Sequence, residues 1–145
     1  MAKKKPLIRQ FLRLSRSRKI LLCQAVVLQV AVRGALTLFP FRRVVRWFSG
    51  PQVAGEASRN EQDITWAVQA AAARIPGTTC LTNALVARFL LTHNGIETRL
   101  HIGVAKDSGR LDAHAWLTVA DRVVIGEVDK MERFTLLPEI SIKDS

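Results

Sequence analysis

The sequence predicts an α+β domain, because helical periodicity occupies the first two thirds of the chain and strand-like alternation follows it. The chain has 145 residues and a mass of 16.2 kDa, which suits one domain with an appended helical segment. Hydrophobic residues make up 48% of the composition, which is enough to bury a core and excludes an intrinsically disordered chain.

The first fifty residues are predicted to be helical. Apolar residues recur at helical spacing in three stretches, and Ser17 and Pro40 are suited to begin the second and the third. Pro and Gly mark residues 51–59 as a linker, so we expect a basic helical segment at 1–50 and a second unit at 60–145. The predicted helices are residues 7–14, 18–38 and 41–48.

The second unit begins with two predicted helices and continues with short strands. Asn60 resembles a helix cap, and Thr78 or Thr79 can cap the helix that follows. Alternating apolar and polar side chains then predict an antiparallel meander of two or three strands. The predicted helices are Glu61–Arg74 and Cys80–His93, and the predicted strands are Glu97–Ala105, Ala113–Val119 and Val123–Ile125.

The formal net charge of +10 is concentrated in one part of the chain. Residues 1–55 hold twelve Lys and Arg and no Asp or Glu, whereas the remaining residues hold ten basic and twelve acidic groups. This division argues against a uniformly basic nucleic-acid-binding domain, so no nucleic-acid partner is expected. We interpret the basic helices first as a solvated pair that covers an apolar face of the second unit. Peripheral attachment to an anionic membrane and docking of an acidic partner are the alternatives.

The two cysteines, Cys23 and Cys80, are too few for a disulfide framework, which favours a reducing, cytoplasmic setting. Residues 20–39 are long enough to cross a bilayer, but Gln29 and Arg33 oppose insertion, since a central Arg alone costs about 3 kcal/mol. The expected location is the cytoplasm, with contact at the inner membrane surface as the alternative. The His and Cys residues show no metal-ligand spacing, so neither a metal nor another cofactor is expected.

Cys80 is the sharpest candidate for chemistry. It follows a Pro-Gly-Thr-Thr turn and opens an apolar helix, where unpaired amides and the helix dipole favour a thiolate. The same amides can stabilise an oxyanion formed on an attacked carbonyl. His114, between the small residues Ala113 and Ala115, is well suited to carry the proton. The alternative for Cys80 is a small buried hydrophobe without a chemical role.

Three segments resemble the lasso-peptide leader peptidases, which belong to the transglutaminase-like, papain-related cysteine hydrolases. Cys80–Ile96 is similar to their Cys-bearing helix, and His101–Val104 and Asp112–Leu117 are similar to their Ile-Gly-Val and Ala-His-Ala-Trp strands. The resemblance is close over residues 60–137, and the Arg-rich start ending at residues 38–43 also resembles the standalone members. It implies a Cys-bearing helix packed on a small antiparallel sheet, preceded by a basic helical segment.

The resemblance implies Cys80 as the nucleophile and His114 as the general base and then the general acid. Many relatives place an Asp twelve residues after the His, but this chain has Gly126 at that position. A backbone carbonyl or a side-chain amide is an alternative way to orient the imidazole. The candidate acids are Glu127 and Asp112 first, and Asp121 and Asp129 after them.

The function implied by the resemblance is removal of the leader peptide from a ribosomally synthesised lasso-peptide precursor. The implied partners are the precursor peptide, a separate leader-recognition protein and an ATP-dependent lasso cyclase. Two alternatives remain open from the sequence. One is a transglutaminase-like acyltransferase that uses the same Cys–His pair, and the other is a non-catalytic adaptor at a membrane surface.

Overall fold

The computed structural model describes residues 9, 12–48 and 60–137. The predicted linker at 51–59 and most of the predicted helix at 7–14 lie outside the described residues. The other predicted helices and strands are all present, which confirms the α+β class. In chain order the elements are α2 (Arg16–Leu38), α3 (Phe41–Phe48), α4 (Glu61–Ala72), α5 (Cys80–His93), β1 (Arg99–Asp107), β2 (Arg110–Val119), β3 (Arg122–Ile125), the 3-10 turn η1 (Met131–Arg133) and β4 (Thr135–Leu136).

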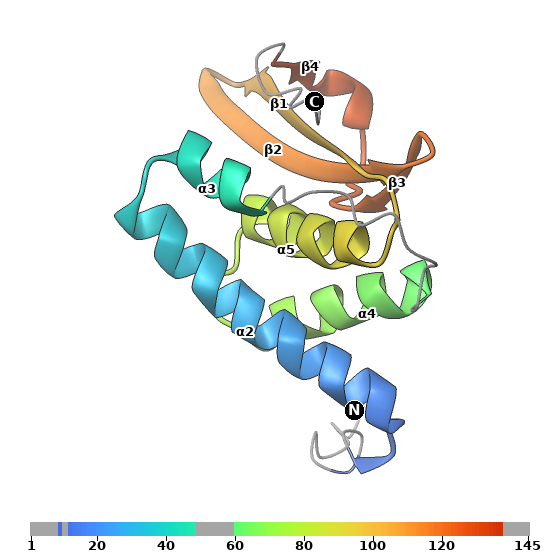
Figure 1. Ribbon diagram of the computed structural model, residues 1–145. Coiled ribbons are helices and arrows are strands. Elements are labelled where there is room, and N and C mark those ends of the chain that lie inside the picture. The colour runs from blue at the N-terminus through green and yellow to red at the C-terminus, as the bar shows by residue number, and fades with distance from the viewer. Residues whose placement is uncertain (1–8, 10–11, 49–59, 138–145) are drawn as a thin grey trace, which may run out of the picture.

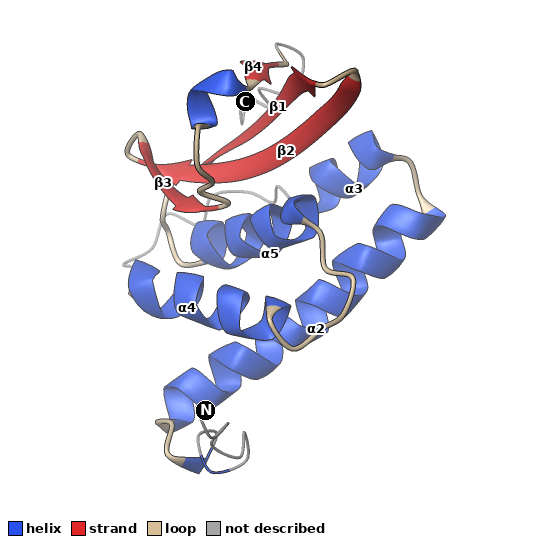
Figure 2. Ribbon diagram, turned by 180° about the vertical axis from the view of Figure 1, so that it is seen from behind, coloured by secondary structure: helices blue, strands red, loops and turns tan. Residues whose placement is uncertain are grey.

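The helices and the sheet form two layers, with the α-helices on one side of the sheet (Figure 1). Helix α5 lies between the sheet and the other long helices, and the view from behind shows the same order (Figure 2). Helix α5 contacts three strands as well as α2, α3 and α4, so it is the central element of the fold. A Cys-bearing helix packed on a small antiparallel sheet is therefore confirmed.

The sheet is antiparallel, with the strand order β3-β2-β1-β4. Strands β1 and β2 form a long hairpin that extends beyond the predicted strand ends, because ladder hydrogen bonds continue where the side chains become polar and exposed. Ala120 and Asp121 have φ of +49° and +63°, the backbone of a tight hairpin turn between β2 and β3. Strand β4 was not predicted, since two residues are too short to show alternation.

The start of α2 differs from the sequence prediction. Ser15 rather than Ser17 is the N-cap, and its side chain accepts a hydrogen bond from the Arg18 amide at 3.3 Å. The prediction of Ser17 was wrong because the helix begins at Arg16, which places Ser17 inside its first turn. The Asn60 cap of α4 is confirmed, although that helix ends two residues earlier than predicted.

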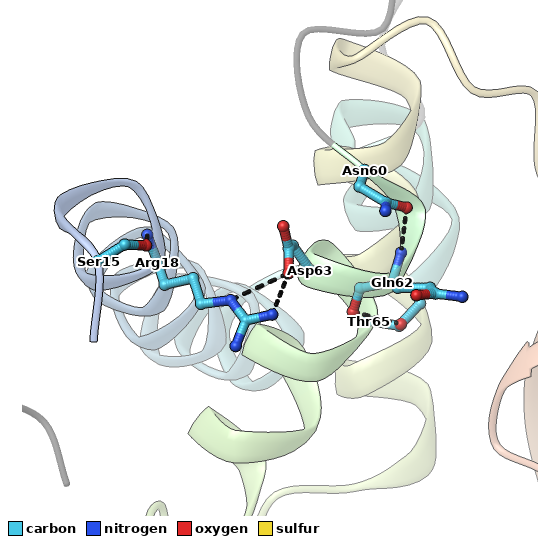
Figure 3. A network of polar contacts seen from close by, with 6 residues as sticks. All are labelled: Ser15, Arg18, Asn60, Gln62, Asp63 and Thr65. Atoms are coloured by element: carbon cyan, nitrogen blue, oxygen red, sulfur yellow. Dashed lines mark hydrogen bonds and ion pairs between the residues drawn. The ribbon is translucent and has the colours of Figure 1, made fainter. Parts of the chain in front are cut away.

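Helix α2 is long and apolar enough to cross a membrane, yet its inner face packs against α4 and α5. Leu21, Ala25 and Val32 on this face are buried. At the start of α2, two nitrogens of Arg18 donate to Asp63 Oδ1 at 3.1 and 2.7 Å (Figure 3). These two hydrogen bonds link the start of α2 to α4.

Buried side chains form two clusters on the two faces of the sheet. The main cluster joins the helices to sheet residues such as Leu100 and Leu117. The smaller cluster consists of Ala105, Trp116 and Phe134 on the other face. Because side chains alternate along a strand, each residue of β2 belongs to one of these two environments.

Candidate active site

Cys80 is the first residue of α5 and directly follows the N-cap residue Thr79. The Thr79 side chain accepts a hydrogen bond from the Thr82 amide at 3.2 Å, and its carbonyl accepts one from the Asn83 amide at 3.1 Å. Within the described part of the chain, the amides of Cys80 and Leu81 donate to no acceptor. Two N–H groups are therefore available beside the thiol, where a negatively charged oxygen would be stabilised.

Helix α2 supports the turn that leads to Cys80. The Arg33 guanidinium donates to the Pro76 carbonyl, and Gly77 lies so close to it that a side chain at Gly77 would displace the guanidinium. One turn into α5, Asn83 Oδ1 accepts a hydrogen bond of 2.7 Å from the buried Gln29. The sequence carried one weak signal for this support, namely that Gln29 and Arg33 lie four positions apart on a mostly apolar helix.

His114 lies on β2 and is half-buried beside two aromatic rings. The ring centroids of Trp116 and Phe134 lie 6.1 and 5.4 Å from that of the imidazole. Its Nε2 donates a hydrogen bond of 2.6 Å to the Gly126 carbonyl. Because a carbonyl only accepts, Nε2 carries the proton, and Nδ1 is the ring nitrogen left to receive one from a nucleophile.

The Gly126 position accepts no other residue without strain. Its φ is +86°, and a Cβ there would lie 2.7 Å from the Ala115 carbonyl oxygen and 3.0 Å from Trp116 Cβ. Gly126 occupies the position, twelve residues after His114, at which the resemblance leads one to expect an Asp. At this position a backbone carbonyl supplies the acceptor that a carboxylate would otherwise supply.

No hydrogen bond or ion pair joins any of the four candidate acids to the His114 ring. Asp112 is exposed and accepts a hydrogen bond of 2.9 Å from Arg133. Glu127 is also exposed and makes no hydrogen bond or ion pair with another described residue. In the structure, the acceptor for His114 is the Gly126 carbonyl instead of a carboxylate. The remaining candidates, both exposed, are Asp121 and Asp129.

Cys80 and His114 lie on α5 and β2, two elements that pack together. Helix α5 packs on one face of the sheet, whereas the His114 side chain points from the other face. The β2 residues Ala115 and Leu117 pack toward the helices, so His114 belongs to the opposite face. Residues 110–116 of β2 have no partner on β3, so the His114 ring lies at an open edge of the sheet. Among the described residues, no hydrogen bond joins Cys80 Sγ to His114. Catalytic hydrogen bonds commonly tighten only when substrate is bound.

His101, on β1, is half-buried. Its Nε2 lies 2.9 Å from Thr118 Oγ1, and its ring stacks on Trp116 at a centroid distance of 5.5 Å. Burial and then the charge of Arg99 lower the pKa of His101, while Asp121 acts in the opposite direction. Over the residues that the structure describes, no three His, Cys, Asp or Glu side chains converge as a metal site requires.

A thiol at the first residue of a helix, packed on a sheet that carries an oriented imidazole, is typical of cysteine-dependent hydrolases and acyltransferases. A family model described as the transglutaminase-like superfamily matches residues 25–139. The chain belongs to this superfamily, whose members are typically cysteine-dependent enzymes. Comparison with curated proteins and with solved structures gave no significant match.

Proposed function

We propose that this chain is a cysteine peptidase that removes the leader from a ribosomally synthesised lasso-peptide precursor in the cytoplasm. Membership of the transglutaminase-like superfamily supports cysteine-dependent chemistry. The similarity of the Cys80 helix and the Ala-His-Ala-Trp strand to leader peptidases supports this substrate. The observation that carries the proposal is the position of Cys80 at the first residue of α5, beside two amides without acceptors.

The first half of the reaction forms an acyl-enzyme. His114 Nδ1 takes the proton of the Cys80 thiol, and the sulfur attacks the scissile carbonyl carbon. The amides of Cys80 and Leu81 are placed to stabilise the oxyanion of the tetrahedral intermediate. His114 then gives its proton to the leaving amine, the carbon–nitrogen bond breaks, and the core peptide leaves with a free N-terminus. The leader remains attached to sulfur as a thioester.

The second half of the reaction regenerates the thiol. Water loses a proton to His114 and attacks the thioester carbonyl, the carbon–sulfur bond breaks, and His114 returns the proton to the sulfur as the leader is released with a free carboxylate. Throughout both halves of the reaction, the Gly126 carbonyl accepts a hydrogen bond from His114 Nε2–H and stabilises the imidazolium. A carbonyl carries no full charge, but a cysteine needs less help from an orienting acid because its thiolate is already a good nucleophile.

The proposal is tested by incubating the precursor, the separately produced leader-recognition protein and this chain, and measuring released core peptide by mass spectrometry. We expect Cys80→Ala to reduce release by at least about 10³-fold. Cys23→Ala is the matched control, since Cys23 is the other free cysteine and lies on the exposed side of α2. Equal release by wild type and Cys80→Ala would contradict the proposal.

The same assay distinguishes a peptidase from an acyltransferase with the same Cys–His pair. With an added primary amine, a peptidase still releases the leader mainly as a carboxylic acid. An acyltransferase would instead give the leader amide, because the amine replaces water in the attack on the thioester. The masses of the two leader products differ, so one measurement decides between these reactions.

A further inference from the structure

The outward face of α2 is an apolar stripe on the side opposite the core. Along the helix its members recur every three or four residues, which places them on one face. Ile20 is 52% exposed, Val27 65% and Leu38 77%, far more than the residues of the inner face. We call this surface the α2 stripe. Its residues are Ile20, Cys23, Val27, Val30, Ala31, Gly34 and Leu38.

The α2 stripe ends at an exposed aromatic pair beside arginines. Phe39 and Trp47 pack edge to face, with centroids 5.0 Å apart, and both remain substantially exposed. Arg46 directly precedes Trp47 in sequence, Arg43 lies one helical turn before it, and both arginines are exposed. An exposed aromatic pair flanked by arginines suits the boundary between lipid headgroups and acyl chains.

The α2 stripe borders a shallow groove between α2 and α5. The groove has a volume of about 780 Å³ and a largely apolar lining, to which Ile20, Val27, Phe89 and Leu90 contribute. Its α5 wall begins nine residues after Cys80, which is more than about 13 Å along a helix. The groove is therefore separate from the candidate active site.

The part of the chain that carries the α2 stripe and α3 is positively charged. The described residues 12–48 include eight Lys and Arg and no Asp or Glu, so an anionic surface is the complementary partner. A spanning orientation is excluded while the fold is intact, because the inner face of α2 is buried and joined to α4 by the Arg18–Asp63 ion pair. Figure 1 shows α2 lying along the helical layer, on the side away from the sheet.

We propose that the α2 stripe, with the Phe39–Trp47 pair and the arginines of α3, docks this protein on the surface of an anionic lipid bilayer. Within the stripe the weak thiol of Cys23 is the one side-chain hydrogen-bonding group, and the polar Gln24 lies at its border in the groove, whereas protein interfaces carry about one hydrogen bond per 100–200 Å². An acyl-chain region needs no such partner, and the arginines meet the lipid phosphates. The proposal is independent of the proposed peptidase activity.

The test is co-sedimentation of the whole chain with vesicles of phosphatidylcholine, with or without phosphatidylglycerol. We expect binding to the phosphatidylglycerol vesicles that weakens when salt rises from about 0.1 to about 0.5 M, because salt screens the headgroup attraction. The double variant Val27→Glu, Val30→Glu should reduce binding by about tenfold or more. Both side chains are exposed, so the variant should keep its thermal unfolding midpoint.

Leu111→Glu is the matched control, since Leu111 is 74% exposed but lies on the distant β1–β2 hairpin. It should bind vesicles as the wild type does. A second readout is a polarity-sensitive dye on Cys23 in the Cys80→Ala variant, whose emission should shift to the blue on anionic vesicles. The proposal is overturned by absent vesicle binding, by equal binding to neutral vesicles, or by wild-type binding of the double variant. Capture of a protein through the stripe without vesicle binding would likewise overturn it.

Discussion

The start of α5 and the outward face of α2 each present a free cysteine, and the two surroundings differ in what they can do. Cys80 opens its helix beside two unpaired amides, although it is less exposed than Cys23. Cys23 lies in the middle of α2, where every nearby amide is used by the helix and the surrounding side chains are apolar. The position of a cysteine along its helix therefore decides its chemistry more than its exposure does.

The two regions are also connected through α2. Gln29 on its buried face donates to Asn83, and the exposed Arg33 donates to the Pro76 carbonyl in the turn before Cys80. The outer face of the helix carries the apolar α2 stripe. One helix thus supports the candidate active site from one side and presents the proposed membrane surface on the other.

Among variants that keep both Cys80 and His114, the largest predicted effect concerns Gly126. Gly126→Ala should reduce leader cleavage by about 10²-fold, because the new Cβ would push on Ala115 and Trp116 and move the carbonyl that orients His114. The matched control is Gly109→Ala. Gly109 has a similar φ of +83° but no atom within 4 Å of an added Cβ. The control should lose about 1–3 kcal/mol of stability from backbone strain while retaining activity.

The carboxylates near His114 give the complementary prediction. Asp112→Asn and Glu127→Gln should each change kcat/KM by less than about threefold, since neither side chain forms a hydrogen bond or ion pair with the imidazole. A loss of about 10²-fold or more in either variant would show that this carboxylate replaces the Gly126 carbonyl during catalysis.

The next largest effect is a difference in thiol reactivity. At pH 7, iodoacetamide should alkylate Cys80 about tenfold faster than Cys23, because Cys80 has unpaired amide donors beside its sulfur at the start of α5 and Cys23 lies in the middle of a helix. Peptide mass spectrometry after timed quenching gives both rates in one sample. His114→Ala should slow alkylation of Cys80 and leave Cys23 unchanged. Faster reaction of Cys23 would remove the distinction between the two regions.

A smaller effect is predicted for the connection through α2. Arg33→Met should lower kcat/KM by about fivefold, because the turn before Cys80 loses its guanidinium donor. The matched control is Arg74→Met, since Arg74 also donates to a backbone carbonyl but within α4 and its C-terminal turn. A normal rate in Arg33→Met would show that α2 does not help to position the turn.

The smallest effect is on the pH dependence of stability. Burial lowers the pKa of His101 below its ordinary value of 6.5, so the unfolded chain binds the proton more readily. The stabilisation from neutral His101 is present above pH 6.5. It is lost as the pH falls through the lower pKa that His101 has in the folded state. His101→Gln should therefore flatten the pH dependence of the unfolding free energy below pH 6.5, as measured by urea titrations at a series of pH values.

The sequence predicted most of the fold because its helices and longer strands have clear periodicity. The Cys80 helix was predicted with its observed ends, since Thr79 and Asn94-Gly95 mark both of its ends. The cap of α2 was misplaced because Ser15 and Ser17 are chemically equivalent, and only the backbone conformation separates them.

The candidate site was only partly predictable, because its supporting contacts join residues far apart in the chain. The hydrogen bond from Gln29 to Asn83 spans 54 positions, and the one from His114 to Gly126 uses a backbone atom that no side-chain motif reveals. Charge and hydropathy also could not separate the two faces of α2, since both are apolar. The two faces of α2 differ because one of them is buried against α4 and α5.

The most direct test of the central claim, that Cys80 is the nucleophile, is to trap it with its own substrate. A leader peptide ending in an electrophilic chloromethyl ketone should be incubated with the chain and the leader-recognition protein, and the adduct mapped by mass spectrometry. We predict one leader per chain, attached to Cys80, and no adduct in Cys80→Ala. Attachment to Cys23, or equal labelling of the Cys80→Ala variant, would contradict the claim.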